Sequence, residues 1–144
     1  MRFRVYGLPQ PKGSTRAFFV KKLGRAVITN DNPKTKGWEK TVGIVAVASG
    51  LLPEGTVADG PVEVGLTFFL PRPKGHSNAK LRLLPSAPER HTKKPDLDKL
   101  ARAVLDALTG IVWRDDAQVV KLTCAKVFAD GDILPGVTIE VNAA

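Results

Sequence analysis

Aspartates are clustered in one stretch of the sequence, "KKPDLDKLARAVLDALTGIVWRDDAQ", residues 93–118. Asp96 and Asp98 are two positions apart, and Asp115 and Asp116 are adjacent. Carboxylates held close together repel one another unless a positive charge compensates them. That charge comes either from nearby lysines and arginines or from a divalent metal ion. These two alternatives predict different proteins.

An amphipathic helix is predicted over about 96–109, because its apolar residues fall on one arc at 100° per residue. The arc is made by Leu97, Leu100, Ala101, Val104, Leu105 and Leu108. Asp98, Arg102 and Asp106 fall on the opposite side as a charged stripe. Asp96 and Asp98 then lie where the chain enters the helix and is still extended, so their side chains can converge.

Two or three converging carboxylates suffice for Mg²⁺, which takes oxygen ligands and keeps several waters. The third carboxylate would come from Asp115 or Asp116, just before the strand predicted to begin near Val119. Each piece also has an ordinary structural explanation. Aspartate at a helix start caps the helix and complements its dipole. "RDD" before a strand is a common turn, and a charged stripe is usually a solvated face.

The rest of the chain predicts a small mixed β-sheet with two main helices packed on it, an α/β (α+β) fold in a single domain over 1–144. Strands are expected at 2–8 and 61–70, and a hairpin at 17–30 that turns near Gly24. A helix is expected at 31–50, with Asn32 as its N-cap and Gly50 as its stop. The segments "VVKLTCAKVF" and "GVTIEVN" are expected to form an antiparallel pair of strands. Residues 71–95 contain five prolines and predict a long basic loop.

The formal net charge is +8, from 22 Lys and Arg against 14 Asp and Glu. The cations are concentrated in residues 1–40 and 72–94, which favours a polyanionic partner such as nucleic acid. Apolar runs are far shorter than the roughly 20 residues of a membrane helix, and no signal-peptide core is present. We therefore expect a cytoplasmic protein without membrane contact. A single cysteine and two distant histidines exclude a disulfide framework and a cysteine- or histidine-rich metal site.

The stretch "KPDLDKLARAVLDALTGIVWRDDAQVV" resembles the signature of the RusA family of Holliday junction resolvases, small endonucleases frequent in phages and prophages. That signature is (R/K)-x-D-x-D-N, a helix ending in D-A-L, a short turn with an aromatic residue, and D-D-x-Q-V. The resemblance implies that Asp96, Asp98 and Asp116 are metal-binding catalytic aspartates, with Asp115 as an accessory. The sequence departs from the family at Lys99, where asparagine is usual, and at Arg102, where the family has a catalytic lysine.

The resemblance implies a homodimer that resolves four-way DNA junctions by symmetric hydrolysis in recombination and repair, with Mg²⁺ as cofactor and Mn²⁺ as a substitute. Arg102 or Lys99 would stabilise the charge that develops on the phosphate. The candidates for DNA contacts are Lys12, Arg16, Arg72, Lys74, Lys93, Lys94 and Lys99. The dimer surface is expected at "GIVAVA" in the first helix or at the N-terminal strands. Tyr6, Phe18, Phe19 and Trp113 either stack at the junction centre or fill the core, and the small number of aromatic residues favours the core.

The sequence is also compatible with two other functions. One is another Mg²⁺-dependent phosphoryl or nucleotidyl transfer enzyme, although the sequence has no glycine-rich nucleotide loop. The other is a non-catalytic basic module that binds nucleic acid, which explains the charge but not the grouped aspartates.

Overall fold

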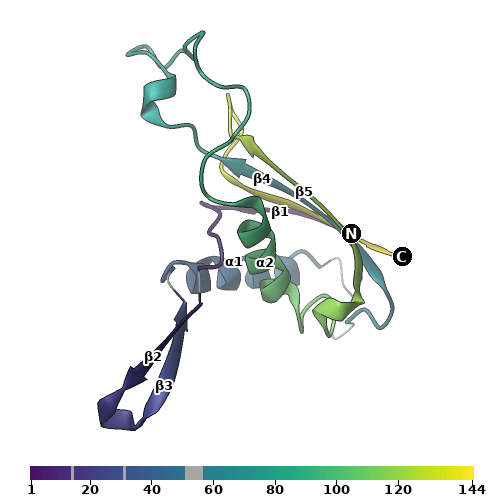
Figure 1. Ribbon diagram of the computed structural model, residues 1–144. Helices are drawn as coiled ribbons and strands as arrows, with labels where there is room; N and C mark the ends of the chain where they lie inside the picture. Colours follow the sequence, from purple (N-terminus) through teal and green to yellow (C-terminus); the bar gives the residue numbers. More distant parts are fainter. Residues whose placement is uncertain (14, 31, 51–56) are drawn as a thin grey trace.

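The computed structural model describes residues 1–13, 15–30, 32–50 and 57–144, with only the backbone at 15–18, 20, 23 and 27–30. Figure 1 shows a sheet with two helices on one side and a hairpin that extends away from both. The elements are, in chain order, β1 Arg2–Tyr6, β2 Thr15–Val20, η1 Lys21–Leu23, β3 Arg25–Asn30, α1 Thr35–Ala48, β4 Val62–Leu70, η2 Lys74–His76, α2 Leu97–Leu108, η3 Asp116–Gln118, β5 Val119–Phe128 and β6 Gly136–Ala143.

The main sheet has the strand order β1-β6-β4-β5. β5 runs parallel to β4, whereas β6 is antiparallel to both β1 and β4. The mixed sheet with two helices confirms the predicted α+β class. The predicted β5–β6 pair is wrong: α2 carries the chain back along the sheet, so β5 forms beside β4 as a parallel strand. β6 then returns on the other side of β4, and β5 is left at an edge of the sheet.

The hydrophobic core lies between one face of this sheet and the two helices. Every second residue of β4, from Val62 to Leu70, is buried, as the alternating sequence predicted. Buried residues of β1, β6, α1 and α2 complete the same cluster. The opposite face of the sheet is polar and carries the Arg2–Glu140 and Lys121–Glu63 ion pairs. The sheet therefore supports α2 from one side only.

Both helices form close to their predicted positions. α2 buries Leu100, Ala101, Val104 and Leu108 as predicted, together with Ala103. α1 begins at Thr35, so Asn32 is not its N-cap. The Asn32 side chain instead accepts a hydrogen bond from the backbone of Lys34 at 3.1 Å, just before the helix. Gly50 follows α1 with a φ of +63°, a conformation that favours glycine, which agrees with its predicted role as the stop.

β2 and β3 form the predicted hairpin, paired from Thr15–Asn30 to Val20–Arg25 around Gly24. The hairpin stands apart from the sheet and helices in Figure 1. Residues 71–96 form a long loop close to the one predicted at 71–95, and this loop contains η2 and a single antiparallel bridge between Ser77 and Leu83. No helix of the described residues is long and apolar enough to cross a membrane.

Candidate functional site

The chain enters α2 through Pro95 and Asp96. Asp96 has extended backbone angles, φ −69° and ψ 137°, as expected for a residue just before a helix. Its carboxylate makes no capping hydrogen bond, so the ordinary structural role proposed for it is not realised. Instead, Asp96 Oδ2 lies 3.0 Å from Lys99 Nζ. The hydrogen bond and then the charge of Lys99 lower the pKa of Asp96 below its ordinary value, so this exposed carboxylate is ionised.

Two half-buried lysines, Lys126 and Lys12, hold this entry in place. Lys126 on β5 donates from Nζ to the carbonyls of Lys93 at 2.7 Å and Pro95 at 2.9 Å. The backbone N–H of Lys12 donates to the Lys99 carbonyl at 3.0 Å, which ties the N-terminal loop to the first turn of α2. The position of Asp96 is therefore fixed by the end of β5 on one side and by residues 8–13 on the other.

Asp98 and Arg102 lie on the exposed side of α2, one turn apart. Asp106, the third member of the predicted stripe, is used within the protein. Its Oδ2 lies 2.8 Å from Lys12 Nζ, which also lies 2.7 Å from Glu39 Oε1. Asp98 and Arg102 are thus the members of the stripe that face solvent.

The second aspartate pair has a clear structural role. Asp115 accepts from the backbone of Ala117, and Gln118 Oε1 accepts from the backbone of Asp115, which together make a capping box around η3. The Gln118 Nε2 donates to the carbonyls of Ala58 and Gly60 at 2.8 and 2.9 Å. The D-D-x-Q motif therefore fastens the start of β5 to the segment before β4.

Asp116 Oδ1 accepts hydrogen bonds from Thr109 Oγ1 at 2.5 Å and from the Trp113 indole at 2.9 Å. Trp113 is fully buried, which confirms that it belongs to the core. These bonds place Asp116 beside the end of α2. Asp96 lies at its start, and twelve helical residues span about 18 Å.

Within one chain, the structure therefore does not bring Asp116 to Asp96 and Asp98, and the expectation that the three would meet in a single chain is not met. Among the described residues, no group of three or more His, Cys, Asp or Glu is arranged to hold a metal ion. The physical reason is that Thr109 and the buried Trp113 hold Asp116 at the C-terminal end of α2, whereas Asp96 and Asp98 lie at its N-terminal end.

The predicted DNA contacts differ in how freely their side chains face solvent. Lys74, Lys93 and Lys94 are exposed. Arg72 is used within the protein: it pairs with both carboxylate oxygens of Asp130, donates to the Pro88 carbonyl, and lies 3.9 Å over the Phe128 ring. Its side chain is 10% exposed, so it holds the 71–96 loop against β5.

Lys12 is similarly engaged with Glu39 and Asp106. Burial opposes its charge, but the two carboxylates outweigh burial and raise the pKa of Lys12. Lys99 pairs with Asp96, and the Arg16 side chain lies outside the described part of the chain.

The sequence reasoning missed a group of cations at the tip of the hairpin. Lys21, Lys22 and Arg25 are exposed there, beside Phe19, whose side chain is 64% exposed. The sequence contained the signal, because residues 15–30 carry four cations and no carboxylate. Tyr6 is also exposed, at 61%, so it does not fill the core; the Phe18 side chain lies outside the described residues.

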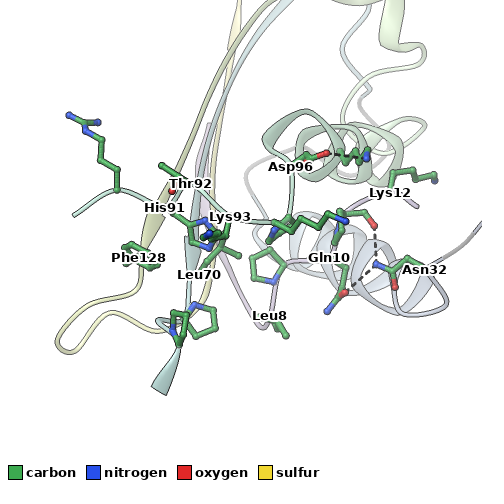
Figure 2. Close-up of a pocket in the computed structure, with 18 of the residues that line it drawn as sticks. Leu8, Gln10, Lys12, Asn32, Leu70, His91, Thr92, Lys93, Asp96 and Phe128 are labelled. Atoms are coloured by element: carbon green, nitrogen blue, oxygen red, sulfur yellow. Dashed lines mark hydrogen bonds and ion pairs between the residues drawn. The ribbon is translucent and has the colours of Figure 1, made fainter. Parts of the chain in front are cut away.

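The start of α2 also borders a pocket of about 580 Å³. Figure 2 shows Asp96 and Lys12 at one end of this pocket and His91 and Phe128 at the other, with Leu8 and Gln10 between them. Several cations lie along its edge: Arg90, Lys93, Lys94 and Lys99. The exposed acid at the helix entry is thus set among positive charges and beside a cavity.

Comparison with known proteins identifies the family of this chain. Residues 9–142 match the family model described as endodeoxyribonuclease RusA. The uncharacterized protein YqaN of Bacillus subtilis (strain 168) is 33% identical over 149 residues, covering 99% of this chain and 98% of that protein. Both the hairpin and the two aspartate pairs fall inside the matched region. The chain therefore belongs to the RusA endodeoxyribonuclease family.

Proposed function

We propose that this protein is a Mg²⁺-dependent endonuclease that resolves four-way DNA junctions by symmetric cuts in recombination and repair. Its membership of an endodeoxyribonuclease family supports the reaction class. The observation that carries the proposal is the entry to α2, where Asp96 makes no capping bond and interacts with the charges of Lys99 and Lys94. Asp98 faces solvent there, and its charge also acts on Lys99. Exposed acids among cations suit a site that receives a phosphate.

Asp96 and Asp98 fit the oxygen-rich site that Mg²⁺ prefers, because the ion accepts two carboxylates and keeps several waters. Asp116 does not join them within one chain. When bound, the ion would neutralise phosphate charge and activate water as a nucleophile. Mn²⁺, a similar hard cation, is expected to substitute.

A second copy of the chain would supply the missing carboxylate. The start of α2 lies near the end of β5, through Lys126, and the end of α2 lies near the start of β5, through Asp116, so α2 and β5 are antiparallel. β5 is an edge strand with exposed Val120 and Leu122. Such an edge is a ready template for pairing with another strand.

If two copies pair through antiparallel β5 strands, their α2 helices also run in opposite directions on the same side of the joined sheet. The Asp116 end of one helix then lies towards the Asp96 end of the other. This homodimer has two-fold symmetry, which matches a four-way junction cut at two related positions. We therefore place the dimer contact at β5 rather than at "GIVAVA" or the N-terminal strands.

Arg102 and Lys99 supply the positive charge of the proposed site. Arg102 lies one turn after Asp98, and its guanidinium can donate two parallel hydrogen bonds to a phosphate. Lys99 holds Asp96 in the free protein and would turn to the phosphate when DNA binds. The hairpin cations Lys21, Lys22 and Arg25, with Lys74, Lys93 and Lys94, would contact the backbone further away and make binding strongly salt-dependent.

The first test is nicking of a synthetic four-way junction, compared with a linear duplex of the same sequence, with and without Mg²⁺. We expect Mg²⁺-dependent nicks at two symmetric positions of the junction and much slower cutting of the duplex. Asp132→Asn is the matched control for the aspartate variants Asp98→Asn and Asp116→Asn, because Asp132 is exposed in a loop away from α2. It should leave cutting unchanged. If the protein binds the junction tightly but cuts it with neither Mg²⁺ nor Mn²⁺, the non-catalytic binding module would be favoured instead.

The shared site is tested by mixing two inactive variants, Asp98→Asn and Asp116→Asn. If each site takes Asp98 from one chain and Asp116 from the other, a mixed dimer carries both changes in one site and none in the other. Mixing then restores cleavage up to that of one intact site. If each site lies within one chain, every site in every dimer is defective, and mixing restores nothing.

A further inference from the structure

The pocket beside Asp96 has mainly apolar walls, which suit a flat, uncharged group. Residues 8–13, the end of β4 with the segment 70–76 that follows it, residues 88–96 and the end of β5 form most of it, and Asn32 and Lys99 complete the lining. Its walls are largely apolar and rich in proline, with Leu8, Pro9, Pro11, Pro73, Pro88 and Pro95 among them. Because the proline ring fixes φ, such walls are rigid before any ligand enters.

The far end of the pocket is held in place by stacked side chains. Arg72 lies over the Phe128 ring at 3.9 Å, and His91 lies 4.9 Å from the same ring. Arg72 is in turn fixed by Asp130 and by the Pro88 carbonyl. The segment that carries His91 and Thr92 is therefore fastened to β5, which keeps the cavity open without a ligand.

The edge of the pocket has the opposite character. Arg90, Lys93, Lys94 and Lys99 line it, and Asp96 stands at the same end as Lys99. An apolar cavity with a cationic edge suits a ligand whose flat, uncharged part enters the cavity and whose anionic part stays outside. A nucleotide within DNA has this form, with a base on one side of the sugar and a phosphate on the other.

We propose that this pocket receives one nucleobase, unstacked from the junction next to the phosphate that is cut. The inference rests on the proposed function, because the phosphate is placed at Asp96 and Asp98. Extruding a base costs stacking and pairing free energy, and it is easiest where the base has already lost a neighbour, as at the centre of a junction. The pocket would then favour some bases over others at this position and so give cleavage a sequence preference.

The test uses junctions with 2-aminopurine, whose fluorescence rises when it leaves the base stack, at each position flanking the cut. Asp98→Asn protein binds them so that no cleavage occurs. We expect a severalfold rise at one flanking position only. Thr92→Trp, which fills the pocket, and Leu8→Gln, which makes its wall polar, should abolish or strongly reduce that rise. Junction affinity should stay within about threefold, since neither change removes a charge.

Ser86→Trp is the matched control, because Ser86 is exposed in the same loop but does not line the pocket. It should leave the rise intact. An equal rise at all positions, no rise at any position, or a rise that survives both Thr92→Trp and Leu8→Gln would overturn the inference. A change of oligomeric state in both pocket variants would also overturn it, because the pocket would then hold part of a second chain. In each case junction cutting by the unmodified protein would still stand, whereas failure to bind or cut junctions would overturn the proposed function itself.

Discussion

The two aspartate pairs at opposite ends of α2 have the same chemistry and very different surroundings. Asp115 and Asp116 are committed to the fold, one in a capping box and the other bonded to Thr109 and to the buried Trp113. Asp96 and Asp98 make no such bonds: Asp96 faces Lys99, and Asp98 faces solvent. The first pair positions its neighbours, whereas the second is left available to a ligand.

In the proposed dimer, Asp116 would serve the site and the fold together. Only Oδ1 of Asp116 is engaged in the hydrogen bonds to Thr109 and Trp113. Those bonds fix the direction of the carboxylate, and they leave Oδ2 for the metal ion that the proposed second chain would share. Asp116 is therefore expected to respond to mutation in both stability and activity, and Asp98 mainly in activity.

The largest effect is expected for Asp98→Asn. Cleavage of the junction should fall by about two to three orders of magnitude, the loss typical when a group that acts in the transition state is removed. Junction binding should be unchanged or tighter, because one negative charge is lost near the phosphate. The free energy of unfolding should fall by at most about 1 kcal/mol, the value of a carboxylate near a helix N-terminus. A parallel loss of binding, cleavage and stability would instead assign Asp98 to the fold.

Asp116→Ala should lower the free energy of unfolding by about 1–3 kcal/mol, because the buried Trp113 indole loses its acceptor. Urea unfolding followed by Trp fluorescence measures this, and cleavage is measured on the same preparation. Asp116→Asn is the matched control: its amide oxygen can still accept from Trp113, so stability should largely return while cleavage does not. If Asp116→Asn kept full cleavage, the proposed role of Asp116 at the metal would be wrong.

The local parts of this arrangement could be predicted from the sequence, and the long-range parts could not. The apolar arc of α2 and the alternation of β4 are set by neighbouring residues, and both are confirmed. The pairing of β5 with β4 depends on where the chain returns to the sheet after α2. The spacing of residues along the sequence carries no information about this long-range contact. The same limit applies to Asp116: its distance from Asp98 along the chain gave no sign that its loop closes around Trp113.

The smallest effect, and the most specific, concerns the ionisation of Asp96. The hydrogen bond and charge of Lys99 lower the pKa of Asp96 below the ordinary 3.8, so the folded protein binds its proton less readily than the unfolded chain does. The pair therefore stabilises the fold fully above about pH 3.8, and this contribution is lost as the pH falls through the lower folded value. Lys99→Met should raise the pKa of Asp96 towards 3.8, as measured by NMR titration of its carboxyl carbon.

The pKa of Asp130, which Arg72 lowers, should not move and serves as the internal reference. Lys80→Met, at an exposed position in the 71–96 loop, should change neither value. An Asp96 that titrates identically with and without Lys99 would show that the carboxylate at the entry to α2 is not held by this lysine, and the contrast between the two ends of the helix would have to rest on Asp98 alone.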